Sequence, residues 1–286
     1  MTALKLTVPL SFTDSSLPIL KSDPMLNAGS LALIEPMHPI SQWGAGVPAS
    51  GATIPNLATK FAVPLLGSNI DGTFINGGFT DATSGKIERT AKGGIHGIVS
   101  QAKDAGPHTS TSAGVTLPTS LWDYVASNPT HDFYASFWAQ TTRGAVSGKF
   151  PVMAIISEGS TTANYLFVMQ NSTRPSATND APSFIGARGG MVDTGPIVRN
   201  VAVSQVTGAM STGAATKARE FGWGRYRNNA SGHFSWVFYR FYMEDLTVSG
   251  RTYAQADAAD LALKNAAFGA GGRYANDTFT DPTTIP

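Results

Sequence analysis

The residues best suited to acid–base chemistry are the carboxylates, and their spacing does not favour catalysis. Glycan hydrolysis needs two carboxyl groups about 5–10 Å apart across a cleft, and two residues of one strand share a face only at i and i+2 or i+4. Glu244 and Asp245 are adjacent, so a strand would point them to opposite faces. A pair from two different strands stays open, but we predict no catalytic residue and no enzyme. The other acidic residues considered are isolated: Glu158, Asp180, Asp193 and Glu220.

Motifs for metals and nucleophiles are equally sparse. The five histidines form no HExxH pair, and the chain contains no G-x-S-x-G elbow. The absence of cysteine excludes disulfides, thiolate-ligated metals and thiol nucleophiles. Calcium stays open because Asp side chains and loop carbonyls can bind it. Asp71 and the pair Asn179-Asp180 are weak candidates, and an ordinary role in turns is the better interpretation. We predict no cofactor and no metal ligand.

The segment Phe-Gly-Trp-Gly-Arg-Tyr-Arg at 221–227 is the most binding-like part of the chain. An exposed tryptophan can stack on a sugar ring, and Trp223 lies beside cationic residues. The candidate receptor or glycan contacts are Trp223, Arg225, Tyr226 and Arg227. The alternative is that Trp223 and Tyr226 fill a core, and both hypotheses stay open for these two residues. For Trp138 and Trp236 we prefer the core.

Short strands joined by turns would position these residues. The chain has 286 residues, with 30 Gly and 17 Pro and only 14% charged residues, a composition that disfavours helices. Strand-like apolar runs between turn residues recur from residue 133 onward. In the strongest run, 233–246, alternation places Phe234, Trp236 and Phe238 on one face. It places Val237, Tyr239, Phe241 and Met243 on the other. Since both faces are apolar, we predict a central strand of an antiparallel, all-β sandwich.

The two ends of the chain differ from this β series. Residues 1–75 are rich in proline and also apolar, which predicts an extended N-terminal anchoring arm. The arm would dock either on its own globular domain or on a neighbouring subunit, and a sandwich domain would follow at 76–250. In the C-terminal region 251–286, an Ala-rich run predicts one short helix that begins after Thr252 and ends at Gly269. We expect 276–286 to be an exposed tail. The anchoring side chains would be Trp43, Val47, Ile54, Leu57 and Phe61.

The net charge and the lack of targeting signals limit the partners and the cellular location that we expect. A formal net charge of +1 argues against a nucleic-acid partner. The first residues lack the basic and apolar regions of a signal peptide. No apolar stretch approaches the ~18 residues of a membrane span. We predict no membrane insertion and no export by the standard secretory route.

Two parts of the sequence resemble virion proteins of tailed bacteriophages. Residues 240–260, Arg-Phe-Tyr-Met-Glu-Asp-Leu-Thr-Val-Ser-Gly-Arg-Thr-Tyr-Ala-Gln-Ala-Asp-Ala-Ala-Asp, resemble the ending of concanavalin A-like (laminin-G-like) jelly-roll domains. In those domains a last strand leads through a Ser-Gly-Arg-Thr turn into an Ala-rich helix. Residues 29–39 and 43–56 are similar to the openings of phage tail and fibre proteins. No calcium-binding or sugar-binding residues of the family match onto this sequence.

The resemblance implies a phage virion structural protein of the tail or baseplate region, assembled in the bacterial cytoplasm. It would be a homo-oligomer, for instance a trimer. Its arm would bind other virion proteins, and its lectin-like sandwich would attach to a host surface glycan or protein. The loops that would carry attachment are 105–116, 173–183 and 208–218. One alternative is a head-decoration or collar protein with a purely cementing role, and a less favoured one is a glycan depolymerase.

Overall fold

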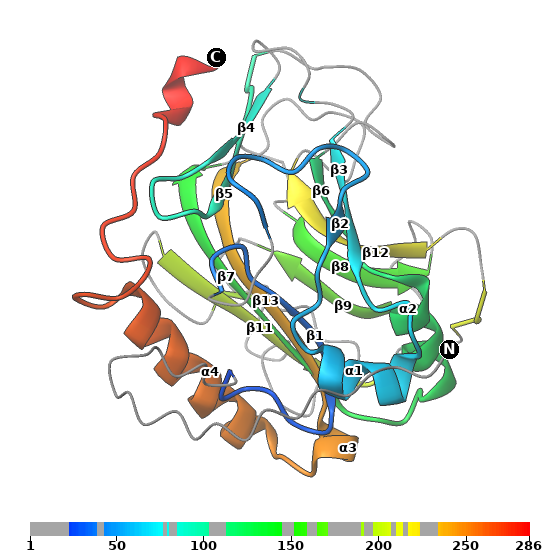
Figure 1. The fold of residues 1–286 in the computed structure, drawn as a ribbon. Coiled ribbons are helices and arrows are strands. Elements are labelled where there is room, and N and C mark those ends of the chain that lie inside the picture. Colours follow the sequence, from blue (N-terminus) through cyan, green and yellow to red (C-terminus); the bar gives the residue numbers. More distant parts are fainter. Residues whose placement is uncertain are drawn as a thin grey trace, which may run out of the picture.

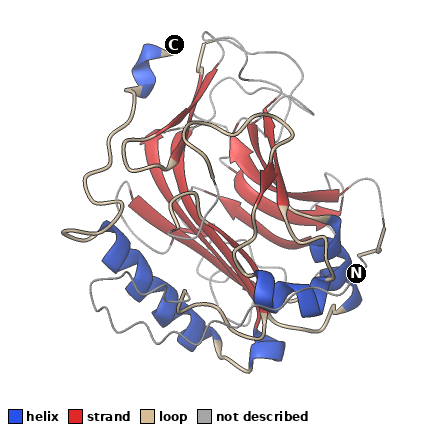
Figure 2. Ribbon diagram, in the orientation of Figure 1, coloured by secondary structure: helices blue, strands red, loops and turns tan. Residues whose placement is uncertain are grey.

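Two antiparallel sheets pack face to face in the computed structural model, with helices at the periphery (Figure 1, Figure 2). The protein is therefore mostly β, as its composition predicted. No helix among the described residues is long and apolar enough to cross a membrane. The structure describes residues 23–38, 43–76, 79, 85–102, 113–144, 152–158, 165–170, 190–191, 197–206, 210–213, 217–223 and 234–286.

The first sheet has seven strands in the order β10-β11-β7-β13-β5-β4, with β1 paired to β13. The second has six, in the order β2-β3-β6-β12-β8-β9. The strands of the first sheet are β1 (Ser30–Ile34), β4 (Gly85–Arg89), β5 (Ile95–Val99), β7 (Phe133–Arg143), β10 (Gly190–Met191), β11 (Ile197–Ser204) and β13 (Ser235–Asp245). Those of the second are β2 (Thr53–Ile54), β3 (Gly72–Asn76), β6 (Ala113–Thr116), β8 (Val152–Glu158), β9 (Tyr165–Gln170) and β12 (Lys217–Trp223).

β13 is the central strand that the sequence predicted. All eleven of its residues are buried. β7 pairs along one of its edges, while β5 and β1 share the other edge, each pairing with a different part of the strand. The central strand therefore holds segments from the beginning, middle and end of the chain together.

The strict alternation predicted along β13 is wrong beyond Phe238, because a bulge interrupts it. Phe238 lies opposite Ala139 of β7 and Arg240 lies opposite Trp138, so Tyr239 is an extra residue. As a result Phe241 returns to the face of Phe238. Both rings pack on Phe137, with centroids 6.3 and 5.1 Å away respectively.

Aromatic rings from both sheets form the core between them. Phe137 of β7 and Phe221 of β12 lie 5.4 Å apart, and Phe221 lies 4.7 Å from Phe238 of β13. Trp236 is fully buried in the same cluster, which confirms its assignment to the core. Trp138 is also fully buried, but it lies on the other face of its sheet and contacts Phe268.

The described parts of residues 1–75 pack on the chain's own domain, one of the two docking sites expected for the arm, but they supply strands of the sandwich where an extended arm was predicted. β1 is buried throughout and pairs with β13. The side chain of Asn56 caps the outer edge of β1. It accepts from Leu33 N and donates to Leu31 O, at 3.0 and 2.9 Å. Among the predicted anchors, Ile54 is 1% exposed, and Trp43, Val47 and Leu57 pack against the core while half-buried. Residues 1–22 lie outside the described part.

The helices are more numerous than predicted. The Ala-rich run forms α4 (Tyr253–Phe268) with Thr252 as N-cap and Gly269 as C-cap, as expected. α1 (Thr59–Leu66) and α2 (Thr119–Ser127) were not predicted, and the predicted anchor Phe61 lies half-buried on α1. α1 forms despite Pro64 because Ala62 and Leu66 pack into the core, so burial outweighs local propensity. Short turns of helix follow at α3 (Leu246–Ser249) and η2 (Pro282–Thr284).

The C-terminal segment is docked, which corrects the prediction of an exposed tail. It runs from the end of α4 up the side of the first sheet (Figure 1). Arg143 donates to Ile285 O at 2.7 Å, and Gln101 N donates to Pro286 O at 2.8 Å. Thr280 N donates to Glu88 Oε1 at 2.7 Å. These hydrogen bonds satisfy the segment's backbone, so it packs as part of the domain.

We predict that Asn56→Ala lowers the free energy of unfolding by about 2–4 kcal/mol. The change strips partners from several buried backbone groups, each of which costs about 1–3 kcal/mol when left unsatisfied. Urea denaturation measures the difference. The control is Asn265→Ala on the exposed face of α4, which should change stability by less than about 0.5 kcal/mol. Equal small effects at both positions would contradict the placement of this segment in the fold.

Candidate functional site

The predicted contact Trp223 lies in the core, so the alternative weighed in the sequence analysis holds for it. Its side chain is 2% exposed, and its Nε1 donates to Trp236 O at 2.8 Å. The ring closes over Gly97, where any Cβ would lie 2.3 Å from it. A tryptophan held in this way cannot stack on a sugar. Arg225, Tyr226 and Arg227 lie outside the described residues.

The candidate attachment loops are described only in part. Residues 113–116 form β6, and 173–183 lie outside the described part. In the 208–218 loop, Ser211 O accepts from Trp122 Nε1 and Gly213 N donates to Asp123 Oδ1, each at 2.8 Å. This described part of the loop is therefore fastened to α2.

The densest group of charged side chains surrounds Arg240 at the bulge of β13. Arg240 is fully buried, and its guanidinium lies 4.9 Å from the ring of Trp138. One amino group donates to both Asp23 Oδ2 and Glu35 Oε2, each at 2.7 Å. The other donates to Asp23 Oδ1 at 2.9 Å. One guanidinium therefore bridges two buried carboxylates.

Further partners complete this Arg240 cluster. Arg273 pairs with Glu35 at 2.5 Å, and Tyr274 donates its hydroxyl to Glu35 Oε1 at 3.0 Å. His38 Nε2 lies 3.6 Å from Asp23 Oδ2. The charges of two guanidinium groups thus offset those of two carboxylates. Buried charges are stable only when they pair with opposite charges and hydrogen-bond to them.

The electrostatics favour the charged forms of Asp23 and Arg240. Burial by itself would raise the pKa of Asp23, but the contacts with His38 and Arg240 outweigh it and hold that pKa well below its ordinary value. Burial would lower the pKa of Arg240, yet the charges of Glu35 and Asp23 raise it above its ordinary value. Asp23 and Arg240 therefore form a charged pair at neutral pH.

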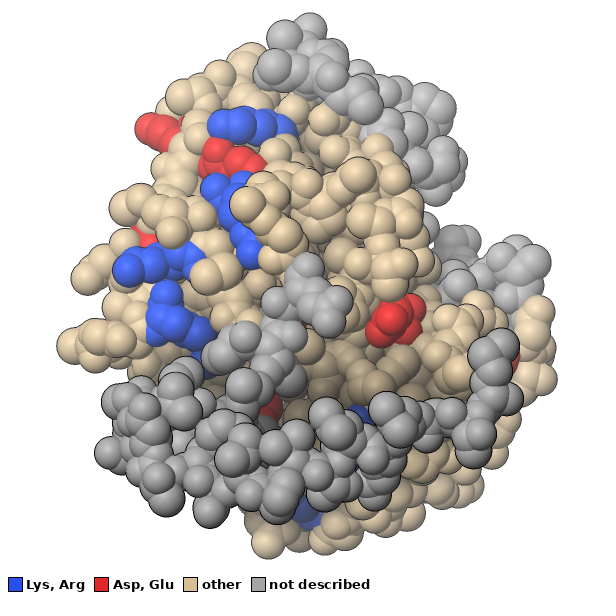
Figure 3. Space-filling model, viewed as in Figure 1, with Lys and Arg blue, Asp and Glu red and all other residues tan. Residues whose placement is uncertain are grey.

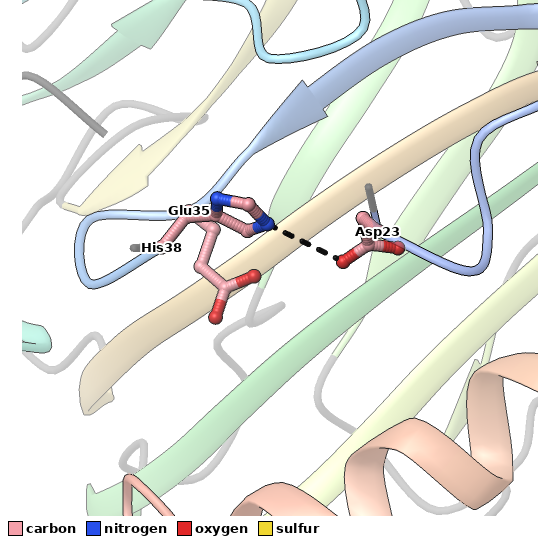
Figure 4. A group of neighbouring side chains, drawn as sticks. All are labelled: Asp23, Glu35 and His38. Atoms are coloured by element: carbon pink, nitrogen blue, oxygen red, sulfur yellow. Dashed lines mark ion pairs between the residues drawn. The ribbon is translucent and has the colours of Figure 1, made fainter. Parts of the chain in front are cut away.

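Asp23, Glu35 and His38 also have the donor set of a metal site. One ligand atom from each lies within 4.8 Å of the others, and Figure 4 shows the three gathered over one face of the sheet. However, Arg240 already bonds both carboxylates and takes the place that a cation would need. The residues present therefore fit an internal ion cluster better than a metal centre.

A second buried group fastens α4 to the sheet. Asp260 is fully buried and accepts from Ser136 Oγ at 3.0 Å, Trp138 Nε1 at 3.1 Å and Arg199 at 3.2 Å. Arg199 also pairs with Asp257 at 2.6 Å. Burial raises the pKa of Asp260, and the charges of Arg240 and Arg199 oppose that effect.

The adjacent acids Glu244 and Asp245 engage different partners, as expected of neighbours on a strand. Glu244 pairs with Arg251, whose Nε donates at 2.9 Å. Asp245 Oδ2 accepts from Tyr124 at 2.8 Å and lies 2.6 Å from His131 Nδ1. These contacts tie the end of β13 to α2 and to the turn before α4.

The buried carboxylates of the described residues are therefore all engaged within the domain. Each of them accepts a hydrogen bond from another side chain of the domain. The calcium candidate Asp71 accepts from Asn56 N at 2.9 Å, as a turn residue does, and Asn179-Asp180 lies outside the described part. The five buried carboxylates are Asp23, Glu35, Glu244, Asp245 and Asp260.

Comparison with known proteins adds little to this description. No family model and no curated protein matches the chain. A weakly similar solved structure is a sialidase of Trypanosoma rangeli, in complex with 2-keto-3-deoxy-D-glycero-D-galacto-2,3-difluoro-nononic acid. The identity is 13% and the TM-score 0.29, over 79% of this chain and 33% of the sialidase chain. Similarity at that TM-score carries no argument about fold or function.

We predict that Arg240→Met destabilises the protein by about 3–5 kcal/mol at pH 7, because Asp23 loses its bridging charge while buried. The free energy of unfolding should also depend on pH in the opposite direction in the variant and in the wild type. In the wild type, Asp23 has a depressed pKa, so its contribution is present above its unfolded pKa and is lost as pH falls below it. In the variant the buried Asp23 carboxylate lacks Arg240 and gains from protonation, so stability should rise as the pH falls from 7 to 5.

Chemical denaturation at both pH values measures this effect. The matched control combines Arg240→Met with Asp23→Asn and Glu35→Gln, which removes all three charges and should recover most of the loss at pH 7. A single variant as stable as the wild type would contradict the central place of the Arg240 cluster.

Proposed function

We propose that this chain is a structural protein of a tailed-bacteriophage virion, in the tail or baseplate region. Its sandwich would be a concanavalin A-like jelly roll that attaches the particle to the host surface. It would act as a homo-oligomer, for instance a trimer, and bind other virion proteins. It would assemble in the bacterial cytoplasm and bind neither nucleic acid nor a membrane.

The observation that carries the proposal is the structure of residues 240–260, the stretch with the clearest resemblance to phage proteins. β13 ends at Asp245, and the chain turns through Gly250, whose φ is 71°. Arg251 of the Ser-Gly-Arg-Thr turn pairs with Glu244, and Thr252 opens α4 with a capping box. The strand, turn and Ala-rich helix that the resemblance implies are thus all formed, and buried contacts hold them together.

The satisfied carboxylates support binding rather than turnover. The described residues form a rigid scaffold in which buried charge is used to join elements. A scaffold of this kind presents its connecting loops in fixed positions, which is how many β-sandwiches bind their partners.

We predict that the purified protein binds saturably to cells of the bacterium that the phage infects, and that their extracted surface polysaccharide competes. It should release no reducing sugar from that polysaccharide. Antibodies against the protein should label the tail or baseplate of intact particles in electron microscopy. Binding is measured by pull-down with whole cells and turnover by a reducing-end assay.

The other outcomes identify the alternatives. A folded oligomer that labels particles but binds no cells would favour the cementing role of a head-decoration or collar protein. Turnover that a single Asp or Glu substitution abolishes would favour a depolymerase. Particles that no antibody labels would contradict a place in the virion.

A further inference from the structure

Arg89 differs in its partners from the other arginines whose side chains the structure describes. Arg199, Arg240, Arg251 and Arg273 each pair with a carboxylate. Arg143 pairs with none of the described carboxylates, but both of its terminal amino groups donate to backbone carbonyls, Ile285 O and Val99 O. Arg89 pairs with no carboxylate among the described residues. Its NH2 group donates to Pro36 O at 3.2 Å and to the sulfur of Met37 at 3.5 Å. Its NH1 group is buried and has no partner.

The position of Arg89 makes this unusual. It ends β4, an edge strand of the first sheet. Lys86 and Glu88 share the face that meets Thr280 of the C-terminal segment, so Ile87 and Arg89 point to the opposite face, toward the core. Burial lowers the pKa of Arg89, and no nearby carboxylate offsets the effect. A half-buried guanidinium without an anion is stabilised when an anion binds to it.

The groups around Arg89 suit a ligand that carries both a ring and a charge. The guanidinium carbon lies 6.0 Å from the ring centre of Trp43, which is half-buried and packs 6.5 Å from Phe238. Aromatic rings at the edge of a core offer a flat apolar surface for a sugar ring, and the arginine fork fits a carboxylate or phosphate.

The flexible side chain of Met37 covers the guanidinium group of Arg89. Its side chain is 41% exposed and rests on Gly93, where a Cβ would lie 2.1 Å from its sulfur. A thioether is a weak acceptor on a flexible chain. An anion that displaced it would replace a weak contact with charge-assisted hydrogen bonds.

Other cations lie near this site. Lys92 is exposed in the turn after β4, and Arg273 pairs with Glu35, the residue before Pro36. In Figure 3, Lys and Arg side chains lie on one side of the visible face, with Asp and Glu side chains among them. The cations nearest to Arg89 can still attract an anionic group over short distances.

We propose that Arg89 and Trp43 form a binding site for the anionic group of an acidic glycan. The inference deepens the proposed function, on which it rests, because it names the class of host polysaccharide. The charge can come from a uronic acid carboxylate or from a phosphodiester, and the guanidinium recognises both. Inward charges on edge strands also prevent strands of two molecules from pairing, so the experiment separates that role from binding.

The experiment is calorimetric titration of the full chain with three probes: oligogalacturonate, a glycerol phosphate oligomer and neutral dextran oligomers. The wild type should bind at least one anionic probe and not dextran. Arg89→Met should weaken that binding by at least about tenfold, since it removes the charge-assisted hydrogen bonds to the anionic group. Trp43→Ala should weaken it as well. Arg89→Lys keeps the charge but loses the forked guanidinium, so its affinity should lie between those of the wild type and Arg89→Met. This variant serves as a second test in case Arg89→Met does not fold.

The control is Lys60→Met, which removes a positive charge from the exposed surface of α1 and should leave affinity within about twofold. Wild type that binds neither anionic probe would overturn the proposal, as would Arg89→Met that binds as tightly as wild type. Self-association of Arg89→Met with unchanged affinity would assign Arg89 to edge protection. Wild-type adsorption to cells that Arg89→Met retains would overturn this site while leaving the proposed function intact.

Discussion

The buried guanidinium of Arg240 is the constraint on which the rest of the structure depends. A charge in the middle of an apolar strand is tolerable only when carboxylates reach it, and here they come from Asp23 and Glu35. The bulge at Tyr239 puts Arg240 on the outer face of the sheet, beside Trp138 and away from the core. The segment around β1 must therefore bring Asp23 and Glu35 to the outer face of β13. Arg273 and Tyr274, from the C-terminal segment, then contact Glu35. One ion cluster thus joins both ends of the chain to the central strand.

The parts of the fold that the sequence predicted are those governed by local patterns. The apolar run of β13, the cap at Thr252 and the end of α4 at Gly269 all depend on residues close in the chain. The Arg240 cluster could not be predicted in this way, because its acids lie more than 200 residues from Arg240 in sequence. The available signal was the arginine itself, since a charge inside a buried strand requires partners. The bulge and the capping of β1 by Asn56 are likewise tertiary features, and they explain why Phe241 and the proposed arm were misplaced.

The contrast between Arg240 and Arg89 links the fold to the proposed function. Both are arginines of strands in the first sheet. The two terminal amino groups of Arg240 bond carboxylates, whereas Arg89 donates only to a carbonyl and a thioether. Charges that are satisfied internally hold a scaffold together, whereas a charge left without an anion can receive one from outside. The prediction that Trp223 contacts a ligand was wrong because the local sequence does not distinguish a buried tryptophan from an exposed one. The combination of aromatic and cation expected there occurs instead at Trp43 and Arg89.

Native-state hydrogen exchange, read by mass spectrometry on peptides covering β1, β13 and α4, tests the central claim most directly. If the Arg240 cluster joins β1 to β13, and the Asp260 group joins α4 to the same sheet, the most protected amides of these elements exchange only through global unfolding and share one free energy of opening. That shared value should match the free energy from denaturation. Amides of β1 that exchange with a markedly lower free energy than those of β13 would show that the N-terminal segment opens as an independent arm, and would contradict this account.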